Sequence, residues 1–221
     1  ATLGQEKNDW QVDLLAVQPL LRDKFRPDQP VDQQWMYAII GHWRRWSEVV
    51  TFEPFYLALN QSAHDSVTEK LIHTPGLRAY GVVPGTGLDF DMSAIYQTGR
   101  NGSRDMQAYG GVFELGHSWK AHPWQPRLSA FYGYASGDRD PKDRQDNRFE
   151  RFFGFGRPWS ANDYIQFENI STPKLRLEAA PTKAFRFDFG YSWYWLASSK
   201  DRFYATGQAD RTGRSGSFAG G

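Results

Sequence analysis

The sequence predicts an all-β protein, specifically an antiparallel transmembrane β-barrel, on three observations. First, aromatic residues make up 16% of the 221 residues, although the mean hydropathy is only −0.65. Second, no run of apolar residues is long enough for a transmembrane helix, whereas barrel strands alternate apolar and polar residues and look hydrophilic on average. Third, a period of two in the apolar residues recurs along the chain, and amphipathic helical patterns are scarce.

The composition also excludes several classes of protein. Lys and Arg total 26 and Asp and Glu total 25, a balance that argues against a nucleic-acid-binding protein. Because Cys is absent, a thiol nucleophile, a Cys-ligated zinc and a disulfide framework are excluded, and no cofactor is expected. Residues 1–8 show neither the cationic start nor the apolar run of a signal peptide.

The alternation predicts about nine strands in chain order. They are 9–19, 34–44, 48–60, 76–84, 87–98, 107–120, 126–136, 173–180 and 184–198. In 48–60 Pro54 interrupts the alternation, so it is ambiguous which residues of this strand share a face.

Three of these strands have a clear apolar face. In 87–98 this face is opposite Asp89 and Asp91, and in 107–120 it is opposite Glu114. In 184–198 one face is aromatic and the other carries Arg186 and Asp188. The aromatic face consists of Phe185, Phe187, Phe189, Tyr191, Trp193 and Trp195. In a barrel, such faces predict lipid contact on one side and a polar lumen on the other.

The links between these strands alternate in length. Short links are predicted at 45–47, 84–86, 121–125 and 181–183. Long links are predicted at 20–33, 61–75, 99–106, 137–172 and from 199 onward. This alternation is typical of outer-membrane barrels, which have short periplasmic turns and long extracellular loops. Residues 137–172 are therefore predicted to form a long extracellular loop, which could gate a pore.

Aromatic residues gather at both ends of the predicted strands, as expected of two membrane interfaces. At the short-link ends these are Trp43, Trp46, Trp119 and Trp124. At the long-link ends the tryptophans are Trp35, Trp193 and Trp195. A soluble β-sandwich with an aromatic core is the alternative explanation of the same residues.

Three segments resemble bacterial outer-membrane alginate export proteins: 134–154 (YASGDRDPKDRQDNRFERFFG), 166–204, and 87–99 (GLDFDMSAIYQTG). The resemblance implies a monomeric 18-stranded barrel that passes an anionic polysaccharide through a charged lumen. Because about nine strands are predicted, residues 1–221 are expected to be a single internal portion of a barrel of 16–18 strands. The terminal residues SGSFAGG are predicted to belong to a disordered loop.

The polar faces of the predicted strands supply the candidate pore-lining residues. They are Arg78, Asp89, Asp91, Glu114, Arg127, Lys174, Arg176, Glu178, Arg186 and Asp188, with Asp13 and Glu53 as less certain additions. Lys174, Arg176 and Arg186 lie on neighbouring strands and could bind carboxylates as a cationic ladder. Alternatively, Arg186 could pair with Glu178, or Arg176 with Asp188, across neighbouring strands. These charges would then stabilise the sheet and would not bind a solute.

Other chemistry finds little support in the sequence. Asp138 begins an acidic run, but the sixth and twelfth positions of a calcium loop would be Asp143 and Phe149 in place of Gly and Glu. The histidines lack metal-ligand spacing, and no G-x-S-x-G motif occurs, so neither a metal site nor an enzyme is predicted.

The predicted function is that of an outer-membrane porin of a Gram-negative bacterium, which passes an alginate-like anionic polysaccharide. The expected partners are outer-membrane lipid, the polysaccharide or small hydrophilic solutes, and periplasmic secretion proteins. Two alternatives remain open. One is a general diffusion or ion-selective porin, and the other is a soluble carbohydrate-binding β protein in which Trp159, Trp193 and Trp195 stack on sugars.

Overall fold

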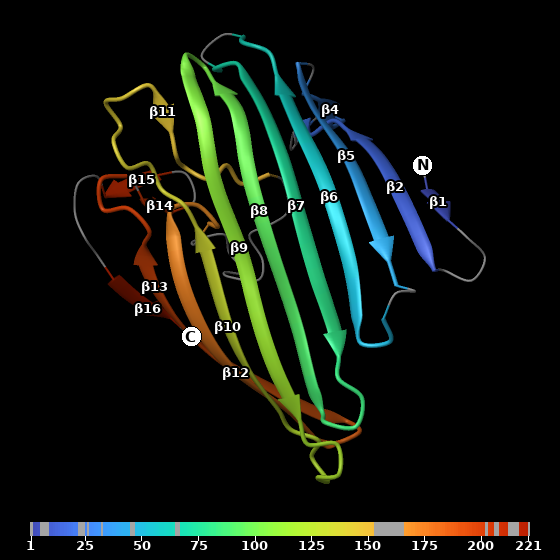
Figure 1. The fold of residues 1–221 in the computed structure, drawn as a ribbon. Helices are drawn as coiled ribbons and strands as arrows, with labels where there is room; N and C mark the ends of the chain where they lie inside the picture. The colour runs from blue at the N-terminus through green and yellow to red at the C-terminus, as the bar shows by residue number, and fades with distance from the viewer. Residues whose placement is uncertain are drawn as a thin grey trace.

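The computed structural model describes residues 2–4, 9–21, 25, 27–31, 33–44, 47–64, 67–152, 166–201, 203–205, 208–211 and 217–220. Its main element is one 12-stranded sheet in the order β1-β2-β5-β6-β7-β8-β9-β10-β12-β13-β16, with β11 paired to β9 (Figure 1). All neighbours in this order are antiparallel, and only β11 is parallel to its partner.

The strands of the sheet are β1 (Thr2–Gly4), β2 (Trp10–Val17), β5 (Gln34–Trp43), β6 (Val50–Gln61), β7 (Lys70–Val82), β8 (Leu88–Asn101), β9 (Arg104–Ser118), β10 (Arg127–Ala135), β11 (Gln145–Asp146), β12 (Ile170–Thr182), β13 (Phe185–Leu196) and β16 (Ser217–Gly220). Two small hairpins lie outside it. They are β3 (Leu20–Leu21) with β4 (Gln29–Pro30), and β14 (Phe203–Ala205) with β15 (Gln208–Arg211).

Each of the nine predicted strands is present, and strands joined by a predicted short link are antiparallel neighbours. Two predicted long links are shorter than expected, because the strands extend beyond the alternating residues. β7 begins at Lys70, and β8 and β9 continue as a ribbon that leaves only Gly102 and Ser103 between them. Gly102 has φ of +62°, a conformation that glycine adopts without strain and that permits this tight turn.

One further expectation needs correction. The terminal residues are not all loop, because Ser217–Gly220 form β16 and pair with β13 from Ser192 to Trp195. This segment lacks a period of two in its sequence, which is why the sequence analysis did not predict a strand there. The sheet itself is open, as expected of a portion of a larger barrel: β1 and β16 lie at opposite ends of the strand order and do not pair within the described residues.

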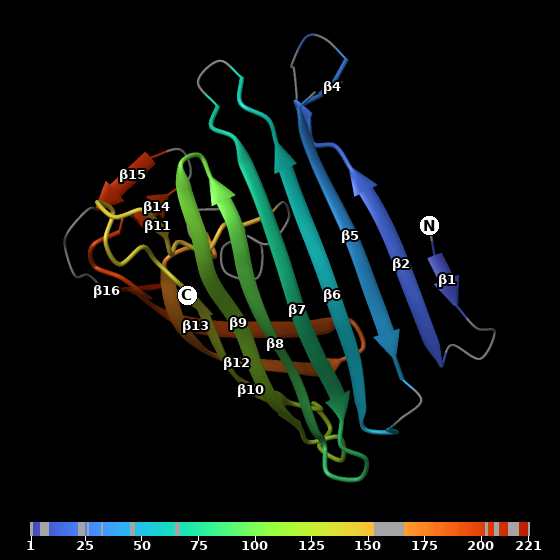
Figure 2. The same ribbon diagram turned by 45° about the horizontal axis from the view of Figure 1, so that its top comes forward.

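The sheet is strongly curved, so that β12 and β13 come round behind β7, β8 and β9 (Figures 1 and 2). The convex face carries exposed apolar side chains, among them Leu77, Phe113, Leu175 and Phe189. The concave face carries the charged residues of the same strands. Glu53 pairs in register with Arg78, which places both on the concave face and resolves the ambiguous phase of 48–60.

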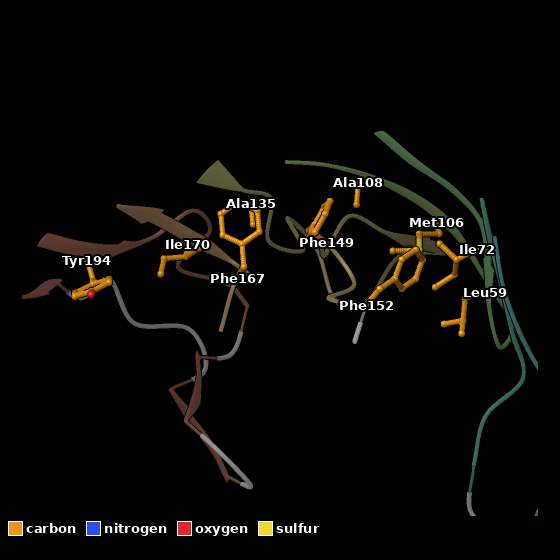
Figure 3. Packing of buried hydrophobic residues seen from close by; sticks show 10 residues of the cluster. All are labelled: Leu59, Ile72, Met106, Ala108, Ala135, Phe149, Phe152, Phe167, Ile170 and Tyr194. Carbon is orange, nitrogen blue, oxygen red and sulfur yellow. The ribbon is translucent and has the colours of Figure 1, made fainter. Parts of the chain in front are cut away.

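The buried apolar core lies between the concave face and the segment that follows β10 (Figure 3). The sheet contributes Leu59, Ile72 and Met106, and the segment contributes Phe149, Phe152 and Phe167. This arrangement differs from a sandwich, because the core is filled by one long link and not by a second sheet. No helix in the described residues is both long and apolar enough to cross a membrane.

Candidate functional site

The concave face carries two groups of ion pairs and hydrogen bonds near the short-link ends of the strands. One runs from β2 to β8 through Arg78, and the other runs from β8 to β13 through Arg127. We call the two groups together the concave charge network. Its members are Asp13, His42, Glu53, Arg78, Asp89, Asp91, Glu114, Arg127, Arg176, Glu178 and Asp188. Because side chains alternate along each strand, these residues all lie on the concave face. The register of the strands places them near the same end of the sheet.

Arg127, the first residue of β10, is the centre of the second group. Its Nε donates to Asp89 at 3.0 Å, its Nη1 to Glu178 at 3.0 Å and its Nη2 to Glu114 at 2.9 Å. Gly116 on β9 makes this possible, because a Cβ there would lie 2.7 Å from Arg127 Cζ. The planar guanidinium thus joins three strands, which a lysine ammonium could not do with the same geometry.

Arg78 on β7 joins β6 and β8 in the same way. Its Nε donates to Asp91 at 2.9 Å and its Nη1 to Glu53 at 3.0 Å. Glu53 also lies 2.6 Å from His42 Nδ1, and His42 Nε2 lies 3.2 Å from Asp13. His42 was not a candidate from its sequence spacing. Only the strand register places it between two carboxylates.

Arg176 belongs to the network and not to a free cationic ladder. Its Nε donates to Asp188 at 2.8 Å, and its Nη2 forms an ion pair with Glu178 at 3.1 Å. Of the two cross-strand pairs considered from the sequence, Arg176 with Asp188 is therefore present. Arg186 with Glu178 is not an ion pair among the described residues.

Lys174 and Arg186 are concave-face cations that have no ion-pair partner within the described part of the chain. Lys174 lies in register with Ser192 on β13, and Arg186 lies near the start of the same strand. Arg186, Glu178 and Asp188 line a hollow of about 400 Å³ together with Arg127.

A second group of charges lies at the long-link end and was missed by the sequence analysis. A hollow of about 660 Å³ is lined there by residues of four links and of β7 to β9, including Lys70, Arg104, Asp138, Arg148, Glu168 and Asp201. Arg104 donates to Asp138 at 2.6 Å, and Arg148 donates to Asp201 at 3.1 Å. These partners are far apart in sequence, so no local spacing could reveal them.

Burial raises the pKa of the Glu168 carboxyl, and Arg148 at 4.0 Å offsets the effect only partly. A carboxyl whose pKa is raised by folding stabilises the folded state most below its unfolded pKa. This stability is lost as the pH rises toward the folded value. We therefore expect Glu168→Gln to flatten the decline in stability above about pH 4.5. Urea unfolding between pH 4 and pH 8 measures this, with exposed Glu69→Gln as the control. An unchanged profile for Glu168→Gln would contradict the assignment.

The predicted interface tryptophans lie at both ends of the sheet. Trp43, Trp119 and Trp124 are exposed near the short links, and Trp35 and Trp195 are exposed near the long ones. Trp193 lies on the same strand as Trp195 and is partly buried. Trp46 and Trp159 lie outside the described residues. Among the residues that are described, no three His, Asp or Glu side chains are grouped so that they could hold a metal ion.

A sequence model of the family described as Alginate export matches residues 1–221. A search of curated proteins found no match. Because the family match covers the whole chain, this protein belongs to the alginate export family.

Proposed function

We propose that this chain forms the wall of an outer-membrane pore that passes an anionic polysaccharide, alginate in the first instance. The supporting observation is the division of one curved sheet into an apolar convex face and a charged concave face. Such a division suits a barrel with lipid outside and water inside. β6 to β9 contain 12 to 15 residues, more than the roughly 9–11 that a tilted strand needs to cross a bilayer.

Family membership supports transport as the activity, since alginate export is the description of the family. In this proposal the sheet is part of a barrel of 16–18 strands, and the exposed tryptophans at its two ends lie in the two membrane interfaces. Residues 136–169, which link β10 to β12, are then on the extracellular side. Periplasmic secretion proteins remain a predicted partner.

Lys174 and Arg186 are the residues to which we assign anion preference. The arginines of the concave charge network are held by carboxylates and offer little free charge, whereas these two cations are unpaired within the described residues. A uronate polymer carries one carboxylate per sugar, and unpaired cations in a pore wall favour anions.

A second candidate, a general or cation-preferring diffusion pore, is favoured by a different observation. In the concave charge network, carboxylates from seven residues face only three arginines and one histidine. Rings of Asp and Glu favour cations. The two candidates differ in ion preference: the first predicts an anion preference that depends on Lys174 and Arg186, and the second predicts no such preference or a preference for cations.

Bilayer recordings of the full-length protein in a KCl gradient distinguish these candidates. We expect Lys174→Gln with Arg186→Gln to shift the reversal potential toward K⁺ and to slow uronate oligomers several-fold in liposomes. Neutral oligosaccharides of the same length should pass at the unchanged rate. Lys183→Gln, in the exposed link after β12, is the matched control. An unchanged reversal potential in the double variant would overturn the assignment and favour the general pore.

A further inference from the structure

The segment after β10 folds back over the concave face instead of projecting away from the sheet. β11 pairs in parallel with β9 at Asp105 and Met106, just above Gly110, where the pairing of β10 with β9 ends. The backbone N–H of Asp105 donates to the carbonyl of Arg144 at 2.9 Å. The segment is thereby added to the sheet as a short extra strand.

Aromatic side chains fix the segment on the wall. Phe149 and Phe152 are only 6% and 4% exposed, and they pack with Leu59, Ile72 and Met106 of the sheet (Figure 3). The ring of Phe149 lies against Gly110, where a Cβ would come within 3.0 Å of it. Lifting the segment would expose these two aromatic side chains to water, which is strongly unfavourable.

Polar contacts hold the same residues in place. Gln97, a wall residue that is 1% exposed, donates to the carbonyl of Glu150 at 2.9 Å and accepts from its N–H at 2.8 Å. The Glu150 carboxylate accepts from Lys70 at 2.8 Å, and Asp146 accepts from Asn101 at 2.8 Å. Because the buried Gln97 side chain satisfies both backbone groups of Glu150, it fixes the position of the segment relative to the sheet.

The ends of the link are fixed as well. The N–H of Asp138 and the guanidinium of Arg148 both donate to Asp201, at 2.9 and 3.1 Å. Asn169 exchanges two hydrogen bonds with Ser198, at 2.7 and 3.1 Å. The segment is therefore attached to β7, β8 and β9 on one side and to the link after β13 on the other.

We propose that residues 145–152 form a fixed constriction of the pore, which sets the largest cross-section that a solute can have. Phe149, Phe152 and Gln97 are its size-determining residues, because they hold the segment at a constant distance from the wall. This inference rests on the proposed function. It differs from the expectation that this link gates the pore, because Phe149 and Phe152 are buried in the core against the sheet.

A disulfide lock tests whether the segment must move. Asp105 and Gln145 are register partners of β9 and β11, both are exposed, and the chain has no Cys. Strands in a ladder lie about 4.8 Å apart. This separation suits a disulfide, whose Cα atoms are usually about 4.4–6.8 Å apart. We expect the full-length Asp105→Cys, Gln145→Cys protein to pass uronate oligomers equally, within about two-fold, before and after reduction in liposomes. Transport that rises several-fold on reduction would show a gate and overturn the inference.

A second measurement tests the size limit. Phe149→Ala with Phe152→Ala should admit neutral oligosaccharides that the parent protein excludes, with at least a several-fold increase in their rate of entry. Phe113→Ala on the convex face is the matched truncation, and circular dichroism checks that each variant folds. An unchanged size limit in a folded double variant would contradict the proposal. If the parent protein passes no uronate oligomer, the proposed function fails instead, while the neutral-sugar limit still tests the constriction.

Discussion

Replacing Arg127 by Gln is expected to lower the free energy of unfolding by about 2–4 kcal/mol. The guanidinium is the shared partner of Asp89, Glu114 and Glu178 on three neighbouring strands. A glutamine amide cannot replace its charge, so three carboxylates would repel one another on a partly buried surface. Urea unfolding of the protein in detergent micelles, followed by tryptophan fluorescence, measures the loss.

Arg100→Gln is the matched control for this prediction. Arg100 is an exposed residue of β8 that has no ion-pair partner among the described residues, so its removal should change stability by less than about 0.5 kcal/mol. Arg127→Lys should retain part of the stability, since the charge remains but the three-way geometry is lost. If Arg127→Gln were as stable as Arg100→Gln, the network would contribute nothing to the cohesion of the sheet.

Replacing Phe189 by Arg is expected to destabilise the lipid-inserted protein by about 2–4 kcal/mol. Phe189 is 65% exposed on the convex face and lies opposite Leu177 on β12. In the proposed barrel this position is near the middle of the bilayer, where a guanidinium loses its hydration. Reversible urea unfolding in phospholipid vesicles measures the effect.

Phe189→Leu keeps the position apolar and should cost less than about 1.5 kcal/mol. The contrast between Arg and Leu should shrink in a soluble protein, because an exposed Arg there would be hydrated. Equal stability of the two variants in lipid would therefore contradict the assignment of the convex face to the membrane. Loss of folding in both variants would instead indicate that Phe189 packs against protein.

The strands and the faces of their side chains could be predicted from the sequence, because both depend on local alternation. Asp89 and Asp91 are on the expected face of β8, and Phe189 is on the opposite face of the sheet from Arg186. The alternation does not show where a strand ends. β7, β8 and β9 extend into residues that read as links, because backbone pairing continues beyond the alternating side chains.

The sequence alone determined that the chain is an antiparallel β protein with one apolar and one charged face, and the resemblance pointed to the alginate export family. Which charges remain available was decided only by tertiary structure. Register brings Arg127 against three carboxylates and His42 between two, whereas Lys174 and Arg186 are left without an ion-pair partner among the described residues. The docking of Phe149 on the concave face was equally unpredictable. It depends on packing with Leu59, Ile72 and Met106, which are far from Phe149 in the sequence and so leave no periodic signal.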